Sequence, residues 1–182
     1  EVTKSVFPTE INVKGTGFDE IATITLEITG GGSTSTEPIP MDVVFGIDSS
    51  GSMAWNDPSD LRLTASKNFV DMMDSSIDTG GVVSWDDNID FTYGLSSDFV
   101  TLKNQIDLVN TEGETNLNVG LNGVIQMLDS NPRIYPSSEV IIFLTDGQGT
   151  YPYSGNPGSP ADDAANKGYT IYSIGLGASH DS

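Results

Sequence analysis

The sequence predicts an α/β protein with a doubly wound, mostly parallel sheet and helices on both faces. Residues 41–47 and 140–145 are apolar runs without alternation, which is typical of strands buried on both faces. Helical patterns, with apolar residues three or four positions apart, lie between the candidate strands. Strands that alternate with helices favour a parallel sheet with crossover connections.

A long helix is expected after the first strand. Asp57 is suited to the N-cap, Pro58 to the first helical position and Asp60 to the first turn. The pattern predicts a helix that extends to about residue 74. Its expected buried face consists of Leu61, Ala65, Phe69, Met72 and Met73.

The remaining elements follow in order. Residues 80–85 and 89–93 are expected to form an antiparallel edge pair around the turn 86–88. A short helix is predicted after Asp98 and a longer one just after Thr115. A last helix begins at Ser159-Pro160 and ends at Lys167-Gly168, and a strand over residues 169–177 follows it.

The first part of the chain has a different pattern. Residues 1–29 alternate between apolar and polar side chains, which predicts a small antiparallel β-segment, and residues 30–38 are typical of a linker. So few strands need a partner sheet. We therefore interpret residues 1–38 as part of a β-sandwich into which the main domain, residues 39–182, is inserted. On this hypothesis, sequence beyond Ser182 completes both the sandwich and the main domain.

Composition excludes several classes of function. The formal net charge is −19, from 26 acidic and 7 basic residues, which opposes binding to nucleic acids and to anionic membrane surfaces. The chain has no cysteine, so it is not a small disulfide-framed module. No stretch approaches the about 20 apolar residues of a membrane span, so direct membrane insertion is not expected.

Small oxygen-bearing side chains follow the first buried strand. Asp48, Ser50 and Ser52 are spaced by two, and Gly51 permits a sharp turn between them. In open α/β sheets, ligands bind beyond the carboxyl ends of the strands. One carboxylate and two hydroxyls at that place suit a hard cation, although a capped turn explains this spacing equally well.

Two further motifs distinguish these interpretations. Thr115 lies at the start of a predicted helix, and Asp146-Gly147 follows the second buried strand. Together with the Asp48 motif, they resemble the von Willebrand factor type A family. That family has a metal-ion-dependent adhesion site, written D-x-S-x-S, then T, then D-G. The resemblance covers about residues 41–177. It implies these metal ligands: Asp48, Ser50, Ser52, Thr115 and Asp146.

This set of ligands has a clear chemical consequence. Two carboxylates and three hydroxyls neutralise a divalent ion without completing its shell, so the ion stays electrophilic. The resemblance implies that a partner's Asp or Glu replaces a water molecule on the ion. Mg²⁺ suits an oxygen shell of this size, with Mn²⁺ or Ca²⁺ as substitutes.

Other side chains near these motifs have less specific interpretations. Asp57 and Asp60 could form a second cation site, but helix capping accounts for them fully. Exposed aromatic residues beside a binding centre are typical partner contacts, although such residues can equally pin a loop to its own domain. The candidates for ligand contact are Trp55, Glu114, Tyr151 and Tyr153.

Enzymatic activity is not expected. The only histidine, His180, lies near the end of the sequence, so a Ser–His–Asp triad is not indicated around Ser50 or Ser52. There is no glycine-rich phosphate loop with its lysine.

The sequence therefore predicts a divalent-cation-dependent adhesion domain of a secreted or cell-surface protein, with a protein or extracellular-matrix ligand. The alternatives are an intracellular scaffold of an ATPase or chelatase assembly and a structural surface-layer module.

Overall fold

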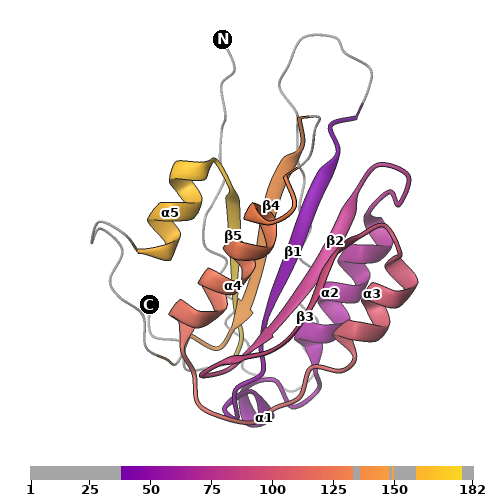
Figure 1. The fold of residues 1–182 in the computed structure, drawn as a ribbon. Helices are drawn as coiled ribbons and strands as arrows, with labels where there is room; N and C mark the ends of the chain where they lie inside the picture. The colour runs from indigo at the N-terminus through magenta and orange to yellow at the C-terminus, as the bar shows by residue number, and fades with distance from the viewer. Residues whose placement is uncertain (1–37, 133–135, 148, 150–158, 178–182) are drawn as a thin grey trace.

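The computed structural model describes residues 38–132, 136–147, 149 and 159–177. This part of the chain contains a five-stranded sheet with the strand order β3-β2-β1-β4-β5 (Figure 1). Strand β1 pairs in parallel with β2 and β4, β4 pairs in parallel with β5, and only β2 and β3 are antiparallel. The predicted mostly parallel sheet and the antiparallel edge pair are confirmed. The strands are β1 (Met41–Asp48), β2 (Thr79–Trp85), β3 (Ile89–Ser96), β4 (Ser138–Thr145) and β5 (Thr170–Gly175).

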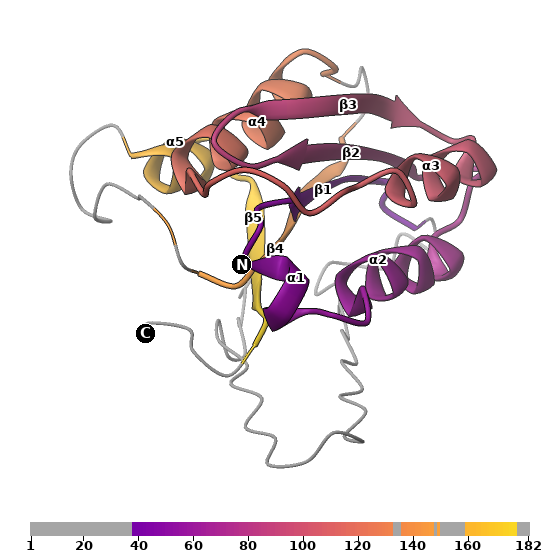
Figure 2. The ribbon, with the colours of Figure 1, turned by 90° about the horizontal axis from the view of Figure 1, so that it is seen from below.

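Helices cover both faces of the sheet. Helices α2 and α3 pack on one face, and α4 and α5 pack on the other (Figure 2). The short helix α1 lies at the end of the sheet where β1 finishes (Figure 1). The doubly wound arrangement is therefore confirmed. The helices are α1 (Met53–Asn56), α2 (Leu61–Met72), α3 (Phe99–Ile106), α4 (Leu117–Asp129) and α5 (Pro160–Lys167).

The central strand β1 supplies both halves of the core. Val43, Phe45 and Ile47 point to the face of α2 and α3, whereas Val44 points to the face of α4 and α5. Each of these side chains is completely buried. This explains why the strand shows no polar alternation: both of its faces lie against apolar layers.

Helix α4 approaches the sheet closely at Gly120. The ring of Trp85 stacks on Phe143, with ring centroids 4.9 Å apart, and Gly120 lies against the same indole. A Cβ atom at position 120 would be 2.4 Å from the Trp85 ring. The buried stack therefore leaves no room for a side chain at this point of the helix.

We expect Gly120→Ala to destabilise the protein, although alanine is the better helix former. Overpacking a core costs about 1–3 kcal/mol, while the gain in helix propensity is at most about 1 kcal/mol. The free energy of unfolding in urea is the measurement. Gly94→Ala is the control, because a Cβ at Gly94 would meet no heavy atom within 4 Å. If the two substitutions change the free energy of unfolding equally, α4 can move away from Trp85 at no cost.

The chain reverses its winding direction at β1. From β1 the chain continues to β2 on one side, and it later returns to β4 on the other side. Ile47 lies opposite Leu144 in the parallel register, so β1 and β4 finish side by side. Ligands of doubly wound proteins bind at such a switch point, and Asp48 and Asp146 are placed there.

The predicted start of α2 is wrong, and its predicted buried face is correct only for Phe69 and Met73, which pack in the core. The helix begins at Leu61 rather than Pro58, because Asp60 has a left-handed backbone with φ 51°. Leu61 and Met72 are 58% and 72% exposed. The other side chains that turn inward are Arg62, Leu63, Ser66 and Val70.

The predicted boundaries of α5 are confirmed. The hydroxyl of Ser159 accepts a hydrogen bond from the Asp162 N–H, and Pro160 occupies the first turn. Gly168 ends the helix with φ 82°, a backbone conformation that favours glycine.

Residues 1–37 lie outside the described residues. The N-terminal β-segment, the linker and the split sandwich therefore remain predictions. Among the helices that the structure describes, none is long and apolar enough to cross a lipid bilayer.

Candidate metal centre

The five residues predicted as metal ligands lie in three loops at one end of the sheet. Asp48 is the last residue of β1, and Ser50 and Ser52 lie in the turn between β1 and α1. Thr115 lies two residues before α4, and Asp146 directly follows β4. Because β1 and β4 are parallel neighbours, their carboxyl ends bring these loops to one edge.

Asp48 is completely buried, and the protein engages both of its oxygens. Its Oδ1 accepts a hydrogen bond from the Ser50 N–H at 2.8 Å, and its Oδ2 accepts one from the Thr145 hydroxyl at 2.6 Å. Burial raises the pKa of Asp48, and the charge of Asp146 raises it further, whereas the hydrogen bonds from Ser50 and Thr145 lower it. Two buried carboxylates whose charges act on each other favour a cation between or beside them.

Asp146 is also completely buried, and Asn56 orients it. The Asn56 side-chain amide donates a hydrogen bond to Asp146 Oδ2 at 2.9 Å. Asn56 is the last residue of α1 and also packs closely on Gly177, where a Cβ would lie 2.8 Å from the Asn56 Cβ. Sequence reasoning missed the roles of Asn56 and Thr145, because neither residue belongs to a spaced motif.

The hydroxyl residues differ in exposure: Ser52 and Thr115 are half-buried, whereas Ser50 is buried. The Oγ atoms of Ser50 and Ser52 are 3.1 Å apart. Ser52 and Thr115 line the same cavity, which has a volume of about 340 Å³. The Gly51 N–H donates a hydrogen bond to the Gly113 carbonyl at 3.1 Å, so the two loops are joined directly.

The loop after Asp146 packs on the loop of Thr115. A Cβ at Gly149 would lie 2.7 Å from Thr115 Cγ2, so only glycine allows this approach. All three loops that carry predicted ligands therefore meet at the carboxyl ends of β1 and β4.

The side chains present fit a divalent ion with an oxygen shell. Two buried carboxylates with three neighbouring hydroxyls match the oxygen preference of Mg²⁺, and they leave shell positions for water. In the described ranges, no group of three or more Asp, Glu or His side chains could hold a metal ion. A metal site at this edge would therefore depend on the hydroxyls as much as on the carboxylates.

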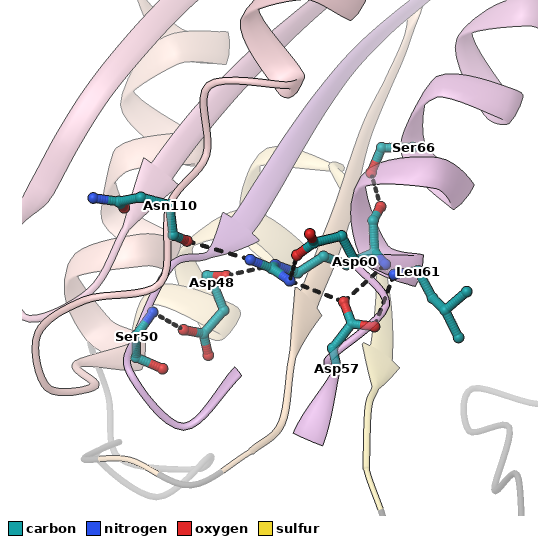
Figure 3. Close-up of polar contacts among 8 residues, drawn as sticks. Asp48, Ser50, Asp57, Asp60, Leu61, Ser66 and Asn110 are labelled. Carbon is teal, nitrogen blue, oxygen red and sulfur yellow. Dashed lines mark hydrogen bonds and ion pairs between the residues drawn. The ribbon is translucent and has the colours of Figure 1, made fainter. Parts of the chain in front are cut away.

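The structure favours the capping interpretation of Asp57 over a second cation site. Asp57 accepts hydrogen bonds from the backbone N–H groups of Leu61 at 2.8 Å and Arg62 at 3.1 Å (Figure 3). Its carboxylate also pairs with the Arg62 guanidinium at 2.9 Å. Asp60 pairs with the same guanidinium and does not cap the helix with its side chain.

Two of the candidate ligand-contact residues lie at the cavity. Trp55, on α1, is 71% exposed and lines the cavity, and the exposed Glu114 lines it from the Thr115 loop. The other two candidates, Tyr151 and Tyr153, lie outside the described residues.

Sequence comparison identifies the family. The sequence model of the von Willebrand factor type A domain matches residues 43–148, more than half of the chain. The chain belongs to the von Willebrand factor type A domain family. A comparison of this type A domain with curated protein sequences finds no significant match.

Solved structures share the fold of this type A domain. The type V pili tip protein Mfa5 from Porphyromonas gingivalis aligns with a TM-score of 0.54 and 22% identity, over 66% of this chain and 22% of that one. An aerotolerance-related membrane protein from Bacteroides fragilis aligns with a TM-score of 0.58 and 19% identity, over 76% and 68% of the two chains. Identities this low show a common fold and nothing more specific.

A third structure is similar to this type A domain and contains a metal. Proximal thread matrix protein 1 from the mussel byssus, with zinc in its metal-ion-dependent adhesion site, aligns with a TM-score of 0.56 and 27% identity. The alignment covers 75% of this chain and 35% of that one. This type A domain thus spans less than two thirds of the pilus tip protein and of the mussel protein.

Proposed function

We propose that this type A domain binds a protein ligand through a divalent cation, as the adhesive part of a secreted or cell-surface protein. The observation that carries the proposal is the buried pair Asp48 and Asp146 beside the hydroxyls of Ser50, Ser52 and Thr115. Buried carboxylates whose charges repel are unfavourable without a cation, so their presence together at this edge of the sheet favours a bound ion.

The chain's own residues would hold and orient the ion. Asp48 and Asp146 supply the negative charge, and the three hydroxyls supply neutral ligands. When bound, the ion provides an electrophilic centre for a ligand carboxylate. The partner chemistry that fits is therefore an exposed Asp or Glu of a protein or matrix ligand.

The relatives support this proposal at a coarser level. Among similar structures are a pilus tip protein and a mussel matrix protein whose own metal-ion-dependent adhesion site is occupied by zinc. A pilus tip and a byssus thread matrix are compatible with an adhesive role. We propose the same general role and location here, with Mg²⁺ in the site and Mn²⁺ or Ca²⁺ as substitutes, and without enzymatic activity.

Two other roles make different predictions about the cation. A scaffold within an intracellular ATPase or chelatase assembly would hold its partner through the protein surface, independently of a ligand carboxylate. A structural surface-layer module would use the ion for self-assembly. The proposed adhesion role instead requires an ion with a position open to an external carboxylate.

We expect the protein to bind Mg²⁺ and Mn²⁺ at one site and to leave the ion accessible to a small carboxylate. Calorimetric titration measures the affinity for each ion. Water-proton relaxation of the Mn²⁺-loaded protein then reports water on the ion. Addition of N-acetyl-glutamic acid α-amide should lower the relaxation rate, because its carboxylate displaces water.

The corresponding glutamine α-amide is the matched control, since it differs only in lacking the carboxylate. It should leave the relaxation rate unchanged. Equal effects of both compounds, or no binding of either ion, would overturn the proposed function.

A further inference from the structure

Arg62 is a buried cation directly behind the candidate metal centre. It lies in the first turn of α2, and its side chain is completely buried. A buried arginine is uncommon unless its charge is paired and its N–H groups are bonded. Neither the ligand motifs nor the proposed function assigns a role to this residue.

The guanidinium bonds to three separate segments. Its Nε donates a hydrogen bond to the main-chain carbonyl of Asp48 at 3.1 Å, and its Nη2 donates one to the main-chain carbonyl of Asn110 at 3.2 Å. Its Nη1 pairs with Asp57 at 2.9 Å and with Asp60 at 3.0 Å. Figure 3 labels the four residues that accept these contacts, Asp48, Asn110, Asp57 and Asp60, and marks the contacts with dashed lines.

Two of these segments carry the predicted ligands. Asp48 is itself a predicted ligand, and Asn110 lies in the loop between α3 and α4 that continues to Thr115. The two segments are also joined by the hydrogen bond from the Glu112 N–H to the Ser49 carbonyl, at 2.7 Å. Arg62 bridges the same two segments a second time, through their main-chain carbonyls.

We propose that Arg62 is a positioning residue of the metal centre: its guanidinium group fixes the separation between the Asp48 turn and the Thr115 loop. This inference rests on the proposed function for its metal-binding consequence. The planar guanidinium is suited to the task because it directs rigid N–H groups to several acceptors at once. Lysine is a single point charge on a flexible stem and cannot bond both carbonyls in this way.

The positive charge is balanced locally. An unpaired cation behind the site would oppose the binding of a metal ion. Asp57, whose side chain is 1% exposed, neutralises Arg62 in the interior, and the 60% exposed Asp60 adds a weaker contact. The Arg62–Asp57 pair can therefore bridge the loops without adding net charge near the ligands.

The first test is the Mg²⁺ affinity of Arg62→Lys, measured by calorimetry. Loss of groups that orient metal ligands typically lowers metal affinity about 10–100-fold, and we expect a loss in that range. Leu102→Ala is the control, because Leu102 is a buried core residue of α3 that packs near Gly80, at the other end of the sheet. It should destabilise the fold but leave the Mg²⁺ affinity of the folded protein unchanged. Unchanged affinity in Arg62→Lys would overturn the proposal.

A double substitution separates positioning from stability. Arg62→Met removes the cation and leaves the buried Asp57 carboxylate without its ion-pair partner. This variant is therefore expected to lose stability or fail to fold. Arg62→Met with Asp57→Asn removes both buried charges together, and its stability should recover relative to the single variant. Its Mg²⁺ affinity should stay about 10–100-fold below that of the wild type. Recovery of both stability and affinity would assign Arg62 a structural role alone.

Hydrogen exchange without metal tests positioning independently of the proposed function. The amides of Gly51 and Glu112 donate the hydrogen bonds that join the two loops. Both amides should exchange faster in the double variant than in a core variant of equal stability. Equal exchange would overturn the positioning role even if the wild type binds Mg²⁺. Conversely, if the wild type binds no Mg²⁺ but exchange does change, the proposed function fails and the positioning role stands.

Discussion

Replacement of Asp48 with asparagine is expected to abolish Mg²⁺ binding and, in EDTA, to raise the temperature of thermal unfolding. Asp48 supplies one of the two formal negative charges in the proposed ligand set, so its loss leaves a divalent ion poorly compensated. The same carboxylate is completely buried, and burial raises its pKa. Without the ion, the charged form therefore weakens the fold, and asparagine removes that charge.

The substitution preserves much of the local geometry. Asparagine has nearly the size of aspartate, and its carbonyl oxygen can still accept the hydrogen bond from the Ser50 N–H. Its amide can donate to the Thr145 hydroxyl oxygen, which at present donates to Asp48. The fold should therefore persist, and only the metal-dependent part of the stability should be lost.

The sign of the pH dependence follows from the raised pKa of Asp48. The folded protein binds this proton more tightly than the unfolded chain, so the ion-free fold loses stability as pH rises from the unfolded pKa to the raised folded pKa, and the loss is complete above it. The advantage of Asp48→Asn in EDTA should therefore be present at neutral pH. It should disappear below the unfolded pKa, which is about 3.9.

Thermal unfolding in EDTA and in excess Mg²⁺ checks the whole prediction. Mg²⁺ should stabilise the wild type by mass action and leave Asp48→Asn unaffected. Asp71→Asn is the matched control, because it makes the same chemical change at an exposed carboxylate that pairs with Lys103. A wild-type response to Mg²⁺ in Asp48→Asn would show that the ion binds elsewhere.

The elements that the sequence could predict are those whose signal is local. The central strand β1 is recognisable because both of its faces are apolar, and its end is marked by Asp48. Helix α5 is recognisable because Ser159 and Gly168 act through adjacent backbone groups. The edge position of the predicted ligands follows from the switch-point rule once the alternation of strands and helices is known.

The burial of Arg62 at the start of α2 could not be predicted, because distant partners decide it. Hydrophobicity favours burial of Leu61 over Arg62, yet Leu61 is 58% exposed and Arg62 is completely buried. Arg62 turns inward because Asp48, Asp57 and Asn110 offer acceptors there. Two of these acceptors are main-chain carbonyls, which leave no trace in the residue types of the sequence. The contact of Asn56 with Asp146 was hidden for a related reason: it joins residues 90 positions apart.

Replacement of Asp57 with alanine is expected to lower the free energy of unfolding by about 3–5 kcal/mol, because it leaves the Arg62 charge buried and unpaired. The loss also includes the acceptor for the Leu61 and Arg62 N–H groups at the start of α2. Such unsatisfied groups add to the cost of the exposed helix end.

The neighbouring carboxylate gives a matched control for this prediction. Asp60 contacts the same Nη1 atom of Arg62 at 3.0 Å, against 2.9 Å for Asp57, so the two ion pairs have nearly the same length. They differ in burial: the Asp57 side chain is 1% exposed and the Asp60 side chain is 60% exposed. Asp60→Asn keeps a residue that tolerates the left-handed backbone of position 60, so it should cost no more than about 1 kcal/mol, as is usual for exposed ion pairs. Urea denaturation of both variants measures the difference. If the two losses are equal, solvent reaches the Arg62 guanidinium and it is not a buried charge, which would also remove the basis for its bridging role behind Asp48.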